Sequence, residues 1–240
     1  MEQISVNTIR IATLYGETMK DIITRNPIPH PPAVVPQACS DGLLKTADLN
    51  DPVAVEVEVW RAAENGYTVR LNLDGIPITE ERVITTADKP GNILTLFIAP
   101  NFLRDQRTYQ LQYRTYSPQS GVEDFSPSVA LKVDRTPAGA ALLAPMIFPN
   151  TDPDAHAIAL VPGYAGMETG DTLHTLCNGV PGPTHTVQPD ELTVRPIEIR
   201  FEQDFLLSLG AQSVVIDYSV TDRAGNNSIR SLPTTLEMAL

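Results

Sequence analysis

Two short clusters of oxygen-bearing side chains are the positions whose types and spacing best suit metal binding. One contains Asp48, Asn50 and Asp51, and the other contains Asp152 and Asp154. Carboxylate and amide oxygens are the ligands that Ca²⁺ prefers, although clusters of Asp, Asn and Pro are also ordinary loop chemistry. These five residues are therefore our calcium candidates, and we expect no cofactor.

Residues arranged for catalysis are harder to find. The nearest carboxylate pairs, Glu80-Glu81 and Asp190-Glu191, are adjacent in sequence, and adjacent residues on a strand point to opposite faces. No nucleophile elbow, phosphate-binding loop or HExxH motif occurs. The histidines lack zinc-site spacing, since they are scattered at positions 30, 156, 174 and 185. We expect a non-enzymatic protein with no catalytic residues.

A few aromatic side chains could form a surface on which a sugar stacks. Trp60 falls on the Glu-bearing phase of its strand, so we expect it to be exposed unless a bulge intervenes; Tyr116 and Phe125 are the other exposed candidates. Together the three form a candidate ligand surface. Tyr113 and Tyr218 instead resemble the tyrosine corner of immunoglobulin-like folds and are expected in the core.

The elements that must position these groups show strand periodicity from residue 52 onward. Val53, Val55 and Val57 alternate with Glu56 and Glu58, which gives one buried and one solvated face. Strand succession without intervening helices favours antiparallel sandwiches. Strands are predicted at 53–59, 67–73, 94–98, 109–113 and 129–133, and again at 157–161, 172–177, 197–201, 214–220 and 234–238.

The strand pattern occurs twice. The segment Gly66–Pro77 reappears 104 residues later as Gly170–Pro181. At the same offset Phe97 aligns with Phe201, and after one inserted residue the offset becomes 105. A period of about one hundred residues is too long for a solenoid unit and suits a complete β-sandwich.

The repeat predicts an all-β protein of two tandem immunoglobulin-like antiparallel β-sandwiches behind an extended N-terminal arm. We assign residues 1–36 to the arm, 37–135 to the first domain and 136–240 to the second. Five prolines lie between residues 26 and 36, and such composition favours an extended, semi-rigid spacer. The arm is either an attachment device or a tail, and the apolar alternation near its start favours attachment.

Charge and composition exclude several classes of protein. A formal net charge of −12 repels phosphate backbones, so we expect no nucleic-acid partner. No apolar run approaches the 18 or so residues that span a bilayer, so no membrane insertion is expected. Residues 1–15 lack a secretory signal. Cys39 and Cys177 are not equivalent in the two copies, which excludes a disulfide repeated in each.

Several turn motifs resemble those of bacterial immunoglobulin-like repeats, which are strung together in large surface or secreted proteins. The matching segments are Pro162–Met167, Gly170–Thr172 and Asp217–Asn226, with Asp41–Leu44 and Val133–Pro137 resembling the boundaries of the first copy. The resemblance covers about residues 37–240. It implies a non-catalytic sandwich used as a spacer, an adhesin stalk or a presenting module.

The functional expectation is accordingly a structural or adhesive module on a bacterial surface or a secreted assembly. An accessory protein of a phage virion is the alternative, because virions are assembled in the cytoplasm without a secretion signal, and a carbohydrate-binding module is the second alternative. The partner would be a protein or a cell-surface glycan. The arm offers a route to a homo-oligomer or a particle-bound assembly.

Overall fold

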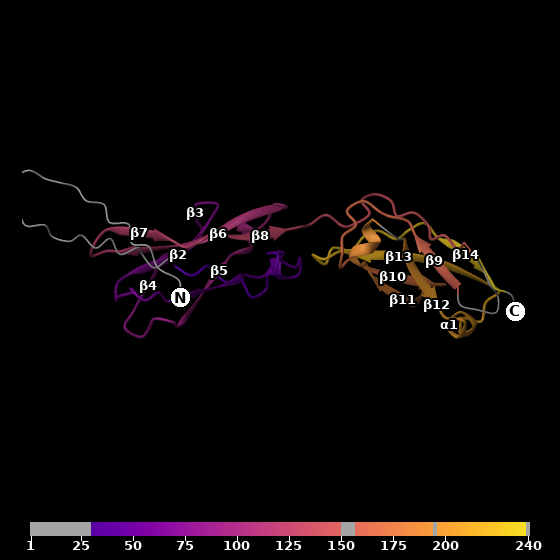
Figure 1. Cartoon of the computed structure of the whole chain (residues 1–240), viewed down its shortest axis with the longest axis horizontal. Helices are drawn as coiled ribbons and strands as arrows, with labels where there is room; N and C mark the ends of the chain where they lie inside the picture. The colour runs from indigo at the N-terminus through magenta and orange to yellow at the C-terminus, as the bar shows by residue number, and fades with distance from the viewer. Residues whose placement is uncertain (1–29, 150–156, 194–195, 239–240) are drawn as a thin grey trace, which may run out of the picture.

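The computed structural model describes residues 30–149, 157–193 and 196–238. Within them the chain forms two antiparallel β-sandwiches that lie end to end (Figure 1). The prediction of an all-β fold with tandem sandwiches is confirmed. The stretch before residue 30 lies outside the described residues, so the expected attachment role of the arm stays a prediction.

The first sandwich packs a two-stranded sheet against a larger one. The small sheet pairs β1 (Val53–Glu58) with β5 (Ile93–Ile98). The larger sheet is ordered β3 (Ile76–Pro77), β2 (Thr68–Leu73), β6 (Arg107–Ser117) and β7 (Val122–Phe125), with β4 (Arg82–Val83) also on β2 and β8 (Val129–Val133) also on β6. Short 3₁₀ turns are η1 (Asp48–Asn50) and η2 (Pro100–Phe102).

The second sandwich repeats this plan. Its small sheet pairs β9 (Ala157–Val161) with β12 (Ile197–Phe201). Its larger sheet is ordered β11 (Val180–Thr186), β10 (Thr172–Cys177), β13 (Ser213–Thr221) and β14 (Thr234–Glu237). The helical pieces are η3 (Pro189–Leu192) and the short helix α1 (Gln203–Ser208).

Each sandwich encloses its own apolar core. On β1 the side chains of Val53, Val55 and Val57 are fully buried while those of the intervening residues are half-buried or exposed, as the period-two pattern predicts. The buried apolar residues fall into two separate clusters, one within 33–133 and one within 138–236. Cys177 belongs to the second cluster as a free thiol, and burial raises its pKa to about 11.

The two copies share their turn chemistry at atomic detail. Asp74 and Asn178 follow β2 and β10, adopt left-handed φ values of 52° and 50°, and are each followed by glycine. Each side-chain Oδ1 accepts a backbone N–H from the neighbouring strand, from Gln110 at 2.8 Å and Val215 at 2.9 Å. Asp and Asn tolerate this conformation and can make such bonds, so the same turn follows the equivalent strand in both copies.

Two equivalent tyrosines anchor the sandwiches. The side chains of Tyr113 and Tyr218 are fully buried. Their hydroxyl groups donate to backbone carbonyls far upstream, that of Pro31 at 2.8 Å and that of Ala144 at 3.0 Å. Both residues are therefore structural, as the sequence predicts.

The pairing of Phe97 with Phe201 in the repeat is wrong by one residue. The first residue of β1 pairs with Ile98, whereas the first residue of β9 pairs with Phe201. Phe201 thus corresponds to Ile98, and both are buried, while Phe97 corresponds to Arg200 and is 54% exposed. A one-residue slip exchanges the two faces of a strand, and the unequal loops before β5 and β12 hid this slip.

Residues 30–35, which the sequence analysis places in the arm, lie against the first sandwich. Ala33 and Val35 are buried in its core. Val34 exchanges both backbone hydrogen bonds with Glu56, at 2.9 and 2.7 Å. This part of the Pro-rich segment therefore makes a single antiparallel bridge to β1, and the domain limits at 36 and 135 stay predictions.

Ser126 offers a test of this shared architecture. Its Oγ accepts the backbone N–H of Tyr113 at 3.0 Å, as that of Ser231 does for Tyr218. Ser126→Ala leaves a buried N–H without its partner, so we expect the free energy of unfolding to fall by about 1–3 kcal/mol in urea denaturation. Ser128→Ala, which removes an exposed hydroxyl, should change it by less than about 0.5 kcal/mol. Equal effects would refute this role for Ser126.

Candidate functional site: the junction between the sandwiches

The aromatic surface predicted from the sequence is not formed as expected. Trp60 is only 9% exposed and belongs to the first core. Its ring contacts His30 at a centroid distance of 5.4 Å and Tyr67 at 6.3 Å. Because β1 ends at Glu58 and a turn begins at Trp60, strand alternation stops applying there, and the indole turns inward.

His30 covers the indole of Trp60 from the start of the described chain. Its Nε2 lies 3.1 Å from Thr115 Oγ1 and 3.3 Å from an Asp124 carboxylate oxygen. Burial lowers the pKa of His30, and the nearby carboxylate of Asp124 offsets part of that effect. The neutral imidazole is therefore the form that the folded chain favours.

We expect Trp60, the sole tryptophan, to report this titration. The pKa of His30 in the folded chain lies below its usual 6.5. The stability that the neutral imidazole contributes to the fold is therefore fully present above pH 6.5 and is lost as the pH falls through the folded pKa. Trp60 emission should stay constant through pH 6.5 and change at lower pH. The change should be absent in His30→Gln, and a midpoint at or above 6.5 would contradict the prediction.

Tyr116 and Phe125 lie on the outer face of the larger first sheet. Arg114 pairs with Phe125 in the β6–β7 register. The Arg114 guanidinium carbon lies 5.1 Å from the Tyr116 ring centroid, and Glu81 and Glu123 both ion-pair with Arg114. Phe125 is 46% exposed, so the two aromatic rings share a partly apolar surface.

The calcium candidates do not form a cluster in the part of the chain that the structure describes. Asp48 and Asn50 lie in η1, where Asn50 Nδ2 donates to the Ala47 carbonyl at 3.3 Å. No group of three or more His, Cys, Asp or Glu residues suited to a metal occurs among the described residues. Asp152 and Asp154 lie outside them, so calcium binding stays a prediction.

One residue of each carboxylate pair considered for catalysis makes contacts that stabilise the fold. Glu81 pairs with Arg114 at 2.8 Å and with Arg70 at 3.5 Å. The buried Glu191 side chain lies 2.8 Å from His185 Nε2 and accepts the Gln188 N–H at 2.7 Å. These contacts stabilise a sheet face and a 3₁₀ turn.

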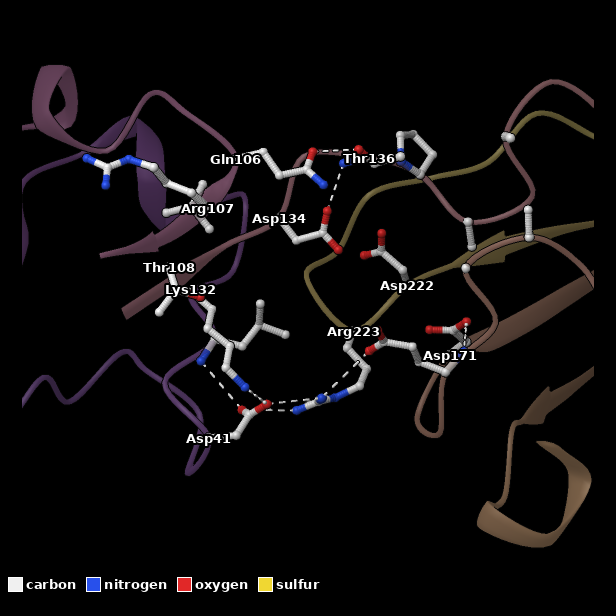
Figure 2. Close-up of a pocket in the computed structure, with 18 residues that line it drawn as sticks. Asp41, Gln106, Arg107, Thr108, Lys132, Asp134, Thr136, Asp171, Asp222 and Arg223 are labelled. Carbon is white, nitrogen blue, oxygen red and sulfur yellow. Dashed lines mark hydrogen bonds and ion pairs between the residues drawn. The ribbon is translucent and has the colours of Figure 1, made fainter. Parts of the chain in front are cut away.

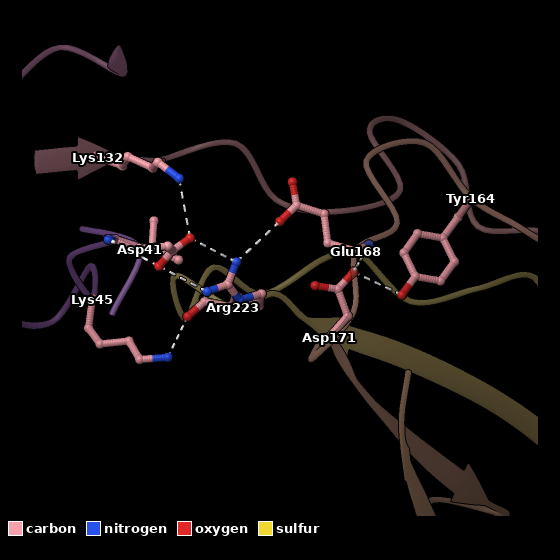
Figure 3. Close-up of polar contacts among 8 residues, drawn as sticks. Asp41, Lys45, Lys132, Tyr164, Glu168, Asp171 and Arg223 are labelled. Carbon is pink, nitrogen blue, oxygen red and sulfur yellow. Dashed lines mark hydrogen bonds and ion pairs between the residues drawn. The ribbon is translucent and has the colours of Figure 1, made fainter. Parts of the chain in front are cut away.

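A loop at the end of the second sandwich that faces the first one makes several hydrogen bonds and an ion pair between the two modules. It is the segment Asp222–Asn226, which we name the junction loop (Figure 3). Inside the loop, Asp222 Oδ1 accepts the Asn226 N–H at 2.8 Å and the Asp222 Oδ2 accepts from Asn226 Nδ2 at 2.9 Å. The loop is therefore held in shape by its own first and last residues.

The junction loop bonds directly to the first sandwich. Thr46 donates its backbone N–H to the Ala224 carbonyl at 2.7 Å and its hydroxyl to Asn226 Oδ1 at 3.0 Å. Asn226 Nδ2 donates to the Asp134 carbonyl at 3.2 Å, and Lys45 Nζ donates to the Arg223 carbonyl. One amide side chain thus connects the loop with two separate segments of the first sandwich.

Arg223 adds a charged contact across the junction. Its guanidinium donates in bidentate fashion to Asp41, at 3.2 and 3.1 Å, and lies 3.9 Å from Glu168 of its own module. Lys132 also pairs with Asp41, at 3.3 Å. The hydrogen bonds from Arg223 lower the pKa of Asp41 to about 2. This contact is therefore present above the ordinary carboxyl pKa and is lost as pH falls toward about 2.

Two glycines make room for this ion pair. Gly42 has φ 86°, and a Cβ there would lie 2.2 Å from the Ala130 carbonyl oxygen, so only glycine lets this segment lie along β8. Gly170 has φ 97°, and a Cβ there would meet the Arg223 side chain at 3.2 Å. These positions place Asp41 and Arg223 within bonding distance.

The connecting segment 134–139 is fastened at both ends. Arg135 donates to the Leu103 carbonyl at 3.1 Å, and the Gly139 N–H donates to the Ala165 carbonyl at 2.8 Å. Ala138 is buried in the second core. Each end of this segment is therefore held by contacts with the sandwich next to it.

A cavity of about 580 Å³ lies between the two modules beside these contacts (Figure 2). Asp134, Asp171 and Asp222 line it, together with residues of both sandwiches. Asp171 is fully buried, and burial raises its pKa. Its Oδ2 accepts from the Tyr164 hydroxyl and from the Glu168 N–H, both at 3.0 Å. Asp171 thereby shapes the loop that faces Arg223.

The residue types of the junction loop predict only a turn. Gly225 and the Asx bonds do make that turn, but a turn needs neither Arg223 nor the external bonds of Asn226. The corresponding loop of the first copy, Ser117–Gly121, has no arginine or asparagine. This difference between copies was the available signal for a contact specific to the second loop.

This chain is similar to known proteins in structure but matches none of them in sequence. No protein-family model matches the sequence, and no curated protein matches it. One similar solved structure concerns host cell surface retention of a 1.5-MDa bacterial ice-binding adhesin, with 15% identity, a TM-score of 0.45 and coverage of 86% of this chain. This chain spans 63% of that adhesin chain.

A second similar structure contains fibronectin(III)-like modules of Clostridium thermocellum CbhA. The identity is 10%, the TM-score is 0.40, and the match covers 86% of this chain and 92% of that one. Identity and TM-score are low in both cases, so no role is inherited from either protein. Among the residues that the structure describes, no helix has the length and hydropathy to cross a membrane.

Proposed function

We propose that this chain is a non-catalytic structural module that holds two immunoglobulin-like sandwiches in a fixed relative orientation, as a spacer or presenting unit of an adhesive assembly on a bacterial surface or outside the cell. The observation that carries the proposal is the junction loop, which bonds to Thr46 and to the Asp134 carbonyl at once. A flexible pair of domains would not need such contacts. No comparison favours the virion alternative.

The hydrogen bonds of Asn226 contribute more to this orientation than the ion pair does. The side chains of Arg223 and Asp41 are each about one-third exposed, and exposed pairs of this kind contribute at most about 1 kcal/mol. Asn226 is partly buried and makes contacts both within the loop and across the junction. Removing its amide leaves several polar groups without partners.

We therefore expect Asn226→Ala to loosen the junction. Pulsed electron paramagnetic resonance between spin labels at the exposed sites Glu80 and Glu198, in a Cys39→Ser background, should give a narrow distance distribution for the wild type. The distribution should broaden at least about twofold in Asn226→Ala.

Asn227→Ala is the matched control. Asn227 bonds to Thr221 of its own module, so its replacement should leave the distribution narrow. A broad distribution in the wild type, or equal widths for Asn226→Ala and Asn227→Ala, would refute the proposal of a fixed orientation.

The partner-binding part of the proposal places contact with a protein or a cell-surface glycan on the outer face that carries Tyr116 and Phe125. Val83 extends this face, because Thr68 of β2 pairs with both Val83 and Tyr116. Arg114 supports the Tyr116 ring from one side. The burial of Trp60 removes the largest of the three candidate rings from the carbohydrate-binding alternative and leaves Tyr116 and Phe125.

The double variant Tyr116→Ser, Phe125→Ser should weaken binding by at least about tenfold on a glycan array and on fixed bacterial cells, since aromatic anchors supply much of the energy of such contacts. Val215→Ser is the control, because Val215 is similarly exposed, at 43%, in the second sandwich. Unchanged binding by the double variant would exclude this face.

A further inference from the structure

Among the residues that the structure describes, the strand β5 has one unpaired edge. Glu56 exchanges its backbone bonds with Val34, on the side of β1 away from β5. Since backbone groups alternate sides along an antiparallel strand, the neighbouring residues 55 and 57 face β5, where they pair with Leu96 and Leu94. It follows that the N–H and C=O groups of the alternate β5 residues point away from β1, namely Ile93, Thr95 and Phe97.

The same three residues also carry the exposed side chains of β5. Ile93 and Phe97 are each 54% exposed, and Thr95 is exposed as well. In the described chain β1 is the sole strand partner of β5. The edge therefore combines open hydrogen-bonding groups with apolar side chains over six residues, Ile-Leu-Thr-Leu-Phe-Ile, which include no charge and no proline.

The second sandwich protects its corresponding edge. In β12 the positions equivalent to Thr95 and Phe97 are Glu198 and Arg200, and charged side chains are a common protection of sheet edges. One end strand of the larger sheet of that module, β11, contains two prolines, which block pairing. The equivalent edge therefore carries charged side chains on β12 of the second copy and uncharged side chains on β5 of the first copy.

We propose that β5 pairs with β5 of a second copy of this chain, antiparallel and about a twofold axis at Thr95. The outward-facing backbone groups fix this register: Thr95 meets Thr95, and Ile93 meets Phe97 in both directions. Thr–Thr and aromatic–β-branched pairs are favourable across strands, and an isologous contact of this kind closes at a dimer.

The self-complementary pairing of Thr95 with Thr95 and of Ile93 with Phe97 favours an identical strand as the occupant, and the edge itself adds no charge that would oppose it. Each chain carries a net charge of −12, so most surfaces of two copies repel each other, yet residues 93–98 bring no charged side chain into the pairing. Two six-residue strands bury less than the roughly 1,200 Å² of a standard stable interface. The dimer is therefore weak and concentration-dependent, with a dissociation constant at or above about 1 μM. This dimer does not depend on the proposed spacer role.

Sedimentation equilibrium tests the dimer. The wild type should shift from monomer to dimer mass between about 1 μM and 1 mM. Thr95→Lys, which places two like charges opposite each other at the axis, should remain monomeric. Thr235→Lys adds the same charge at an exposed strand position of the second sandwich and should dimerise as the wild type does. A wild type that is monomeric throughout, or a Thr95→Lys variant that still dimerises, would overturn the proposal.

Cross-linking tests the register even where Thr95→Lys folds poorly. Facing residues of a hydrogen-bonded antiparallel pair have Cα atoms about 5.5 Å apart, within the range of about 4.4–6.8 Å for a disulfide. In a Cys39→Ser background, Thr95→Cys should form a disulfide dimer under mild oxidation. Phe97→Cys should not, because its two copies would lie more than about 13 Å apart. The reverse result, or cross-linking of neither variant, would overturn this register.

Discussion

The burial of one face of every strand is the constraint on which the rest of this structure depends. Val53, Val55 and Val57 have no exposed surface, and each buried valine contributes on the order of 1.5–3 kcal/mol. A shift of one residue in any strand would exchange this face with the solvated one. The strand registers are therefore fixed, and with them every position at which a polar group or an apolar side chain reaches the surface.

Within this constraint the two copies agree where the backbone leaves no freedom. Asp74 and Asn178 occupy the same left-handed turn position and cap the same neighbouring strand. Ser126 and Ser231 satisfy the same buried tyrosine N–H. The copies differ where the backbone tolerates many side chains, in the loops at the sandwich ends and on the outward face of β5 and β12. The junction loop is one of these differing positions and contacts the other sandwich, and the outward face of β5 is the surface that we propose pairs with a second copy.

The sequence predicts the fold well because strand periodicity and turn residues are local signals. It predicts neither the burial of Trp60 nor the junction, because both depend on residues far apart in the chain. His30 covers Trp60, and Thr46 reaches Asn226 across 180 residues. Nothing local to Asn226 distinguishes a turn residue from a contact residue. The comparison of the two copies carries that information, since the first copy makes the equivalent turn without arginine or asparagine.

The junction and the β5 edge differ in chemistry because the junction forms within one chain, whereas the proposed β5 pairing forms between two chains. The junction joins two modules of one chain, so its partners are always close and modest polar bonds suffice, each contributing about 1 kcal/mol. Two separate chains must also offset the loss of translational and rotational freedom, an estimated 4–15 kcal/mol. Only apolar side chains and a continuous run of backbone bonds offset that cost over six residues. An uncharged edge on β5 in the first copy, and charged residues at the same edge of β12 in the second, favour pairing through β5 over pairing through β12.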